Sequence, residues 1–169
     1  MSLVLRHNPQ KIGITLDENG WADTELLLKG LCKNGHQISL DDLKEVVAKN
    51  DKQRFKFNDD FTKIRANQGH SVAVDVELKE TKPPEMLYHG TATRSLASIK
   101  TEGINSGKRI HVHLSSDKET ATKVGNRHGT PIVLNINAAK MHGDGFKFYL
   151  SDNGVWLVNA VPADYIYQF

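Results

Sequence analysis

Apolar residues recur with helical spacing in three segments of the first fifty residues, and residues typical of helix ends bound each one. The first ends at Asn8-Pro9, because proline keeps the residue before it out of the helical conformation. The second begins at a cap, Asp23 or Thr24, and ends at Asn34-Gly35. The third follows the capping residue Ser39. The pattern therefore predicts three short helices.

Alternating apolar and polar residues predict strands in the same region. The alternation over 12–16 predicts a short strand, and 54–57 and 63–66 flank the turn residues 58–60 as in a β-hairpin. Three helices followed by a two-stranded hairpin are the plan of a winged-helix domain. That plan binds nucleic acid in some proteins and is purely structural in others, so both interpretations stay open.

A charged segment, 75–85, ends in the stiff run Lys82-Pro83-Pro84 and is the predicted domain boundary. It separates a predicted domain over 1–80 from a second over 81–169. Short strand-like runs and two helical segments follow, which predict an α+β fold with a mostly antiparallel sheet and loops that shape a cleft. The strand-like runs are 86–89, 110–114, 131–136, 154–158 and 165–168, and the helical segments are 95–102 and 118–124.

Charge and composition narrow the class of protein. The chain has 22 Lys and Arg against 20 Asp and Glu, a net charge of +2, which is too small for nucleic-acid binding through the overall field. Phosphate recognition would therefore depend on a few placed arginines. The single cysteine, Cys32, excludes an internal disulfide. No apolar run approaches the roughly 20 residues that cross a bilayer, and we expect a soluble cytoplasmic protein.

One predicted strand carries an unusual polar face. Side chains alternate along a strand, so Arg109, His111, His113 and Ser115 share one side while the aliphatic residues between them share the other. A face of Arg, His, His and Ser is typical of a cleft lining, with an ordinary solvated surface as the alternative. A metal site at the two histidines is a further alternative, but no third ligand lies nearby in the sequence.

A second candidate lies just after the predicted boundary. In the segment Tyr88-His-Gly-Thr91, Gly90 has no side chain and lets a ligand or another stretch of backbone approach closely between His89 and Thr91. The alternative is a turn with a capping threonine. A single three-residue signature does not distinguish the two.

A third candidate lies beside the predicted hairpin. Arg65 and the turn at 69–71 could bind an anion through backbone N–H groups and a hydroxyl, or could be surface features without a ligand. The chain has no GxGxxG, no GxxxxGK[ST] and no serine nucleophile elbow. The remaining arginines and histidines suit an oxyanion substrate.

Eight motifs, in order along nearly the whole chain, together resemble one family. This family is the NAD-dependent RNA 2′-phosphotransferases, which act on spliced tRNA in fungi. The motifs are Leu5-Arg-His-Asn-Pro9, Gly20-Trp-Ala22, Arg54-Phe-Lys-Phe57, Ile64-Arg-Ala-Asn-Gln-Gly-His-Ser71, Tyr88-His-Gly-Thr91, His111-Val-His-Leu-Ser115, Val124-Gly-Asn-Arg-His-Gly129 and Gly154-Val-Trp-Leu157.

The resemblance implies an N-terminal winged-helix-like lobe, a C-terminal ADP-ribosyltransferase-like lobe that binds NAD as a co-substrate, and a catalytic Arg-His-Arg-Arg tetrad. The tetrad falls on Arg6, His7, Arg54 and Arg109, although Arg65 in the neighbouring strand is an alternative for the third member. The implied partner is an RNA with an internal 2′-phosphate. The implied phosphate-binding residues are Arg6, His7, Arg54, Arg65, His70, Ser71 and Arg109.

The resemblance also implies an NAD site, with no metal. Its three-residue signature falls on His89, His113 and Val155, where many protein-modifying relatives have an acidic third residue. An apolar residue there fits an acceptor that needs no carboxylate base, because a phosphate is already anionic. The implied NAD-binding residues are His89, Gly90, Thr91, His113, Ser115 and Val155.

Three functions remain open after this comparison. The first is transfer of an internal RNA 2′-phosphate to NAD, giving ADP-ribose 1″,2″-cyclic phosphate and nicotinamide. The second is ADP-ribosylation of a terminal nucleic-acid phosphate or of a small molecule. The third is a non-catalytic module that binds RNA or ADP-ribose, which the presence of all four tetrad residues disfavours.

Overall fold

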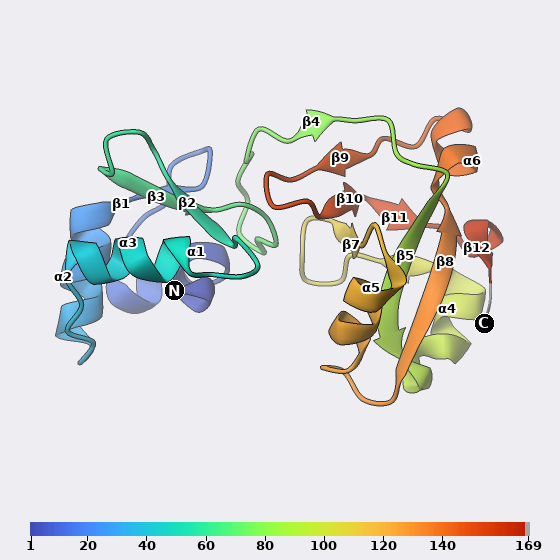
Figure 1. Cartoon of the computed structure of the whole chain (residues 1–169), viewed down its shortest axis with the longest axis horizontal. Coiled ribbons are helices and arrows are strands. Elements are labelled where there is room, and N and C mark those ends of the chain that lie inside the picture. Colours follow the sequence, from blue (N-terminus) through green and yellow to red (C-terminus); the bar gives the residue numbers. More distant parts are fainter. Residues whose placement is uncertain (168–169) are drawn as a thin grey trace. The chain divides into compact units, whose positions relative to one another are not determined.

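A computed structural model describes residues 1–167 (Figure 1). The chain divides into two compact units, Met1–Glu77 and Leu78–Phe169, and the division lies within the charged segment 75–85. Each unit has its own cluster of buried apolar residues. The fold is mixed α/β with antiparallel sheets, as predicted at the level of class.

The first unit packs short helices against a three-stranded antiparallel sheet with strand order β1-β3-β2. Phe55, Ile64 and Ala66 from the sheet join Leu5, Leu27 and Leu43 from the helices in its core. The elements are α1 (Ser2–Arg6), the 3₁₀ helix η1 (Pro9–Ile12), β1 (Trp21–Asp23), α2 (Thr24–Lys33), α3 (Leu40–Ala48), β2 (Phe55–Phe57) and β3 (Lys63–Ala66).

Capping chemistry explains why two helices begin where the sequence predicts. A side-chain oxygen of Asp23 accepts the N–H of Leu26 at 2.8 Å, so Asp23 rather than Thr24 caps α2. Ser39 and Asp42 form a reciprocal capping box at the start of α3. The exposed Cys32 lies in the last turn of α2.

The predicted strand over 12–16 is wrong. Pro9 opens the 3₁₀ helix η1 instead, and the side chain of Asn8 caps it by accepting the N–H of Lys11. Proline fixes a φ that suits the first position of a helix, and this local preference outweighs a brief alternation of apolar residues. Of that alternation, only Ile14 is fully buried.

The second unit is built on the antiparallel pairing of β5 with β8 along seven residues, with α5 packed over both strands. Its sheets have the orders β12-β8-β5, β4-β9-β10-β7 and β11-β6. The elements are β4 (Lys79–Glu80), β5 (Met86–Ala92), η2 (Thr93–Ser95), α4 (Leu96–Glu102), β6 (Ile104–Asn105), β7 (Val112–Leu114), α5 (Lys118–Gly125), β8 (Pro131–Asn137), α6 (Ala138–Gly143), β9 (Tyr149–Leu150), β10 (Trp156–Val158), β11 (Ala160–Val161), η3 (Ala163–Tyr165) and β12 (Ile166–Tyr167).

All five strand-like runs contain a strand, but three begin later than predicted; the run 165–168 is a strand only from Ile166, because Tyr165 ends η3. The run 110–114 is a strand only from Val112, and Ile110 is 41% exposed rather than buried. The run 154–158 is a strand only from Trp156. The prediction for Gln168 lies outside the described residues. Within residues 1–167, the helices are too short or too polar to cross a lipid bilayer.

Candidate active site

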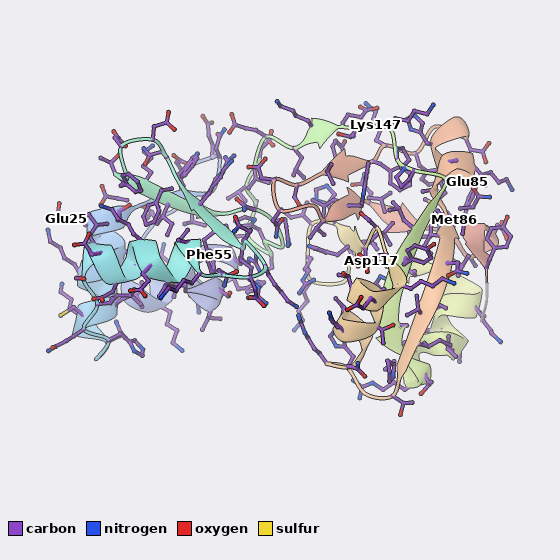
Figure 2. The ribbon with its side chains drawn as sticks, in the orientation of Figure 1. Glu25, Phe55, Glu85, Met86, Asp117 and Lys147 are labelled. Carbon is purple, nitrogen blue, oxygen red and sulfur yellow. The ribbon has the colours of Figure 1, made fainter. Side chains whose placement is uncertain are left out.

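In the first unit, the short helix α1 presents Arg6 and His7 at its C-terminal end. Val4 and Leu5 are buried in the core and hold the helix down, while Arg6 is 8% exposed and His7 is exposed. The Arg6 guanidinium lies over the ring of Phe55, 5.7 Å from its centroid. Phe55 opens β2 directly after Arg54, and Figure 2 labels it on the hairpin of the first unit.

The segment that follows β3 connects the residues predicted to bind phosphate in this unit. The N–H of Asn67 donates to the carbonyl of Arg54 at 2.9 Å, and the N–H of Ser71 donates to the carbonyl of Arg6 at 2.9 Å. A hydrogen bond of 2.9 Å joins Ser71 Oγ and His7 Nδ1. The structure therefore brings three of the four tetrad residues to one edge of the first unit.

His70 differs from its neighbours because it is 2% exposed. Burial, reinforced by the positive charges of Arg6, His7 and Arg65, lowers its pKa to about 4. Its ring donates a hydrogen bond to the carbonyl of Leu5, and its Nε2 is buried. A buried neutral imidazole is suited to holding a backbone in place, and the predicted contact of His70 with RNA phosphate stays a prediction.

The two candidates for the third catalytic arginine lie in different surroundings. Arg65 is 6% exposed, and its Nη1 donates to the Glu77 carboxylate at 3.0 Å and to the Asn19 carbonyl at 3.1 Å. Its guanidinium also lies 4.5 Å from the ring centroid of Trp21. Arg54 is half-buried at the start of the hairpin. These contacts favour a structural role for Arg65, and the assignment of phosphate binding to Arg54 stays a prediction.

In the second unit, His89 and His113 lie on adjacent strands. The ring nitrogen Nδ1 of His89 and the carbonyl oxygen of His113 are 3.0 Å apart, a hydrogen bond that the ring donates. Tyr88 and Ser115 form an isolated antiparallel bridge through two backbone hydrogen bonds of 2.8 and 2.9 Å. Burial lowers the pKa of His89, and the nearby His128 lowers it further. The structure therefore brings three predicted NAD-binding residues together.

Gly90 is required by packing. A side chain at this position would place its Cβ 1.7 Å from the carbonyl oxygen of Ala121 in α5. The sequence predicts that either a ligand or another stretch of backbone approaches Gly90 closely. The structure shows the backbone of α5 there. Thr91, the next residue, is 9% exposed. The contact of Gly90 with NAD stays a prediction. Because glycine has no side chain, such a contact would use the backbone atoms of Gly90 in β5.

The remaining predicted residues lie outside regular strands. Arg109 is exposed in a turn, where its N–H donates to the Ser106 carbonyl, and His111 also precedes the strand, so only His113 of the predicted polar face lies within β7. The His111 ring packs against Tyr149 with centroids 5.7 Å apart. Val155 is half-buried at the end of the loop that precedes β10. Among residues 1–167, no group of three or more His, Cys, Asp or Glu is arranged to hold a metal ion.

Two residues that lie near these sites, Asn67 and Lys118, were not predicted from the sequence as site residues. The side chain of Asn67 donates to the carbonyl of Gln53 at 2.6 Å, and so helps to fix the backbone that carries Arg54. The ammonium of Lys118, at the start of α5, lies 5.7 Å from the ring centroid of Tyr88. Both residues contact partners that are distant in the sequence. Of the two, only Asn67 lies within one of the eight motifs, the one over 64–71.

Comparison with known proteins identifies the family. A model of the RNA 2′-phosphotransferase, Tpt1 / KptA family matches residues 1–160. Proteins named "Probable RNA 2'-phosphotransferase" from Flavobacterium johnsoniae, Hahella chejuensis and Burkholderia pseudomallei are 54%, 53% and 53% identical to this chain over 166 residues. Each alignment covers 98% of this chain and 91%, 89% and 90% of the respective relative.

These matches settle the class of protein. The chain belongs to the RNA 2′-phosphotransferase family and is an enzyme of that class. The resemblance drawn from the eight motifs is thereby confirmed. RNA is the substrate class that the family name implies.

Proposed function

We propose that this enzyme removes an internal 2′-phosphate from RNA by transferring it to NAD. The single observation that carries the proposal is the convergence of Arg6, His7 and Arg54 at one edge of the first unit, in a chain of this family. A guanidinium offers paired donors to phosphate and stays charged at any physiological pH. Two guanidinium groups beside an imidazole would therefore suit a phosphate.

The reaction proceeds in two transfers. A phosphate oxygen of the RNA attacks C1″ of the nicotinamide ribose, and the C–N bond to nicotinamide breaks. The 2″-hydroxyl of that ribose then attacks the phosphorus and gives up its proton to solvent, and the bond to the RNA 2′-oxygen breaks as that oxygen takes up a proton. The products are RNA with a 2′-hydroxyl, ADP-ribose 1″,2″-cyclic phosphate and nicotinamide, so every atom of the transferred phosphoryl group is accounted for.

The residues divide between the transfers. Arg6, Arg54 and Arg109 bind the phosphate and stabilise the charge that develops on its oxygens. His7 supplies a proton to the departing 2′-oxygen, because histidine alone among the four titrates near neutral pH. Phosphoryl transfer of this kind depends mainly on positioning and electrostatics.

We assign NAD to polar groups of the second unit. His89, His113 and Thr91 lie on adjacent strands and are only partly exposed, so a ligand there would be shielded from water. NAD carries a negatively charged pyrophosphate, and the basic residues nearby are Lys118 and His128. The polar and basic character of these residues supports the assignment of NAD to β5 and β7.

The test uses the purified chain, NAD and a short RNA with one internal 2′-phosphate, followed by mass analysis of the products. We expect nicotinamide, 2′-hydroxyl RNA and the cyclic phosphate. A stable ADP-ribosylated nucleic acid as the end product would instead indicate an ADP-ribosyltransferase. Binding of NAD or RNA without nicotinamide release would indicate a non-catalytic module.

A further inference from the structure

The segment Gly69-His70-Ser71 holds the end of α1 that carries the catalytic pair. The last carbonyl groups of a helix have no partner within the helix. In α1, the carbonyl of Leu5 accepts from the His70 ring and the carbonyl of Arg6 accepts from the N–H of Ser71. Gly69 has a φ of 84°, which lets the chain turn back toward α1 at this point.

Ser71 also reaches the side chain that we assign to proton transfer. Its hydroxyl oxygen lies 2.9 Å from Nδ1 of His7, although the two residues are 64 positions apart in the sequence. A hydrogen bond at one ring nitrogen fixes the orientation of the imidazole and the position of its proton. His7 stands on an exposed helix end, where a side chain without such a bond would sample several rotamers.

We propose that Ser71 is a positioning residue that orients His7 for the second transfer, with the buried His70 holding α1 beneath it. This inference rests on the proposed function. It assigns to Ser71 a role through His7, in place of the direct contact with RNA phosphate that the sequence resemblance implies. His70 supports the same arrangement from the core, because it is 2% exposed and bonds the helix end.

The chemistry explains why orientation matters at this position. A protonated imidazole carries a proton on both nitrogens, so Nδ1–H donates to Ser71 Oγ while the proton on Nε2 is the one available to a leaving group. Transfer of a proton requires the donor within about 3 Å of its acceptor. Misplacement of the ring by even ~1 Å therefore slows the step.

The experiment compares Ser71→Ala, Ser71→Thr and, as a control, Ser98→Ala, which removes a hydroxyl that donates to the nearby Ser95 carbonyl at the end of η2. We expect Ser71→Ala to lower kcat about tenfold, the scale of ~1.4 kcal/mol. KM for RNA and the melting temperature should stay near the unaltered values. Ser71→Thr keeps the hydroxyl and should restore kcat to within about threefold.

A double-mutant cycle with His7→Ala completes the test. A residue that acts through His7 has no further effect once His7 is absent, so Ser71→Ala should change kcat by less than about twofold in that background. An additive effect, a failure of Ser71→Thr to rescue, or a rise in KM for RNA with unchanged kcat would overturn the proposal. If the unaltered protein transfers no phosphate to NAD, the proposed function itself fails, which is a separate result.

Discussion

At the scale of single residues, Arg54 and Arg65 carry the same charge but lie in different surroundings. Arg65 is stacked on Trp21 and paired with Glu77, so its Nη1 is already engaged within the fold. Arg54 sits at the entrance to the hairpin, next to the helix that carries Arg6 and His7. Sequence spacing alone left the two candidates open, and the contacts of Arg65 favour Arg54.

Alanine substitution separates the two arginines. We expect Arg54→Ala and Arg109→Ala each to reduce turnover by about 10²-fold or more, the scale of losing one oxyanion donor, with little change in melting temperature. We expect Arg65→Ala to lower the melting temperature clearly, because it leaves Asn19 and Glu77 without their buried partner. Steady-state rates and thermal melts check both. Full activity in Arg54→Ala would assign the phosphate contact elsewhere.

His7 has a role that rapid-quench kinetics can isolate. Release of nicotinamide needs no proton donor, whereas departure of the RNA 2′-oxygen benefits from one. We therefore expect His7→Ala to slow the second transfer at least as much as the first, so that ADP-ribosylated RNA accumulates when labelled RNA is followed. Product formation at the normal rate in both steps would mean that His7 is structural and that water supplies the proton.

At the scale of elements, capping residues predicted the starts of helices, whereas the alternation of apolar residues could not predict the shortest strands. Asp23 and Ser39 marked the starts of α2 and α3, because a cap is a local interaction within four residues. The strands β4, β6, β9 and β11 have two residues each and are too short to show an alternation. The contact between His7 and Ser71 spans 64 positions and depends on the tertiary fold, so no local pattern could reveal it.

The contact between β5 and α5 makes a sharp prediction about Gly90. The added Cβ of Gly90→Ala would overlap the Ala121 carbonyl, so α5 has to move, and we expect a loss of ~3 kcal/mol or more. Gly143→Ala is the matched control, because no atom beyond its chain neighbours and the adjoining backbone of α6 lies within 4 Å of the position that its Cβ would occupy. Denaturant unfolding of both variants checks this. Equal stability of the two would contradict the packing that we describe.

At the scale of the whole molecule, each unit has its own core, and the proposed chemistry draws on both. Three tetrad residues lie in the first unit and Arg109 in the second. The residues that we assign to NAD all lie in the second unit, whereas most of those that we assign to RNA phosphate lie in the first. Turnover should therefore require both units to be folded.

The buried His70 makes the stability of the protein depend on pH. Its pKa is about 4 in the folded protein against a usual value of 6.5, so the unfolded chain binds more protons between these values. The free energy of unfolding should therefore fall, by up to ~3 kcal/mol, as the pH drops from about 6.5 to 4. His70→Asn should flatten this dependence, and substitution of the exposed His36 should not. Urea titrations across that range measure it.

Cys32 offers a practical consequence at the same scale. It is the one cysteine of the chain, and its thiol is exposed in the last turn of α2. A maleimide dye, spin label or biotin would therefore attach at a single known position without any change to the sequence. The protein as it stands can be immobilised in one orientation, or made to report on its first unit by fluorescence, while every residue assigned to RNA and NAD keeps its natural side chain.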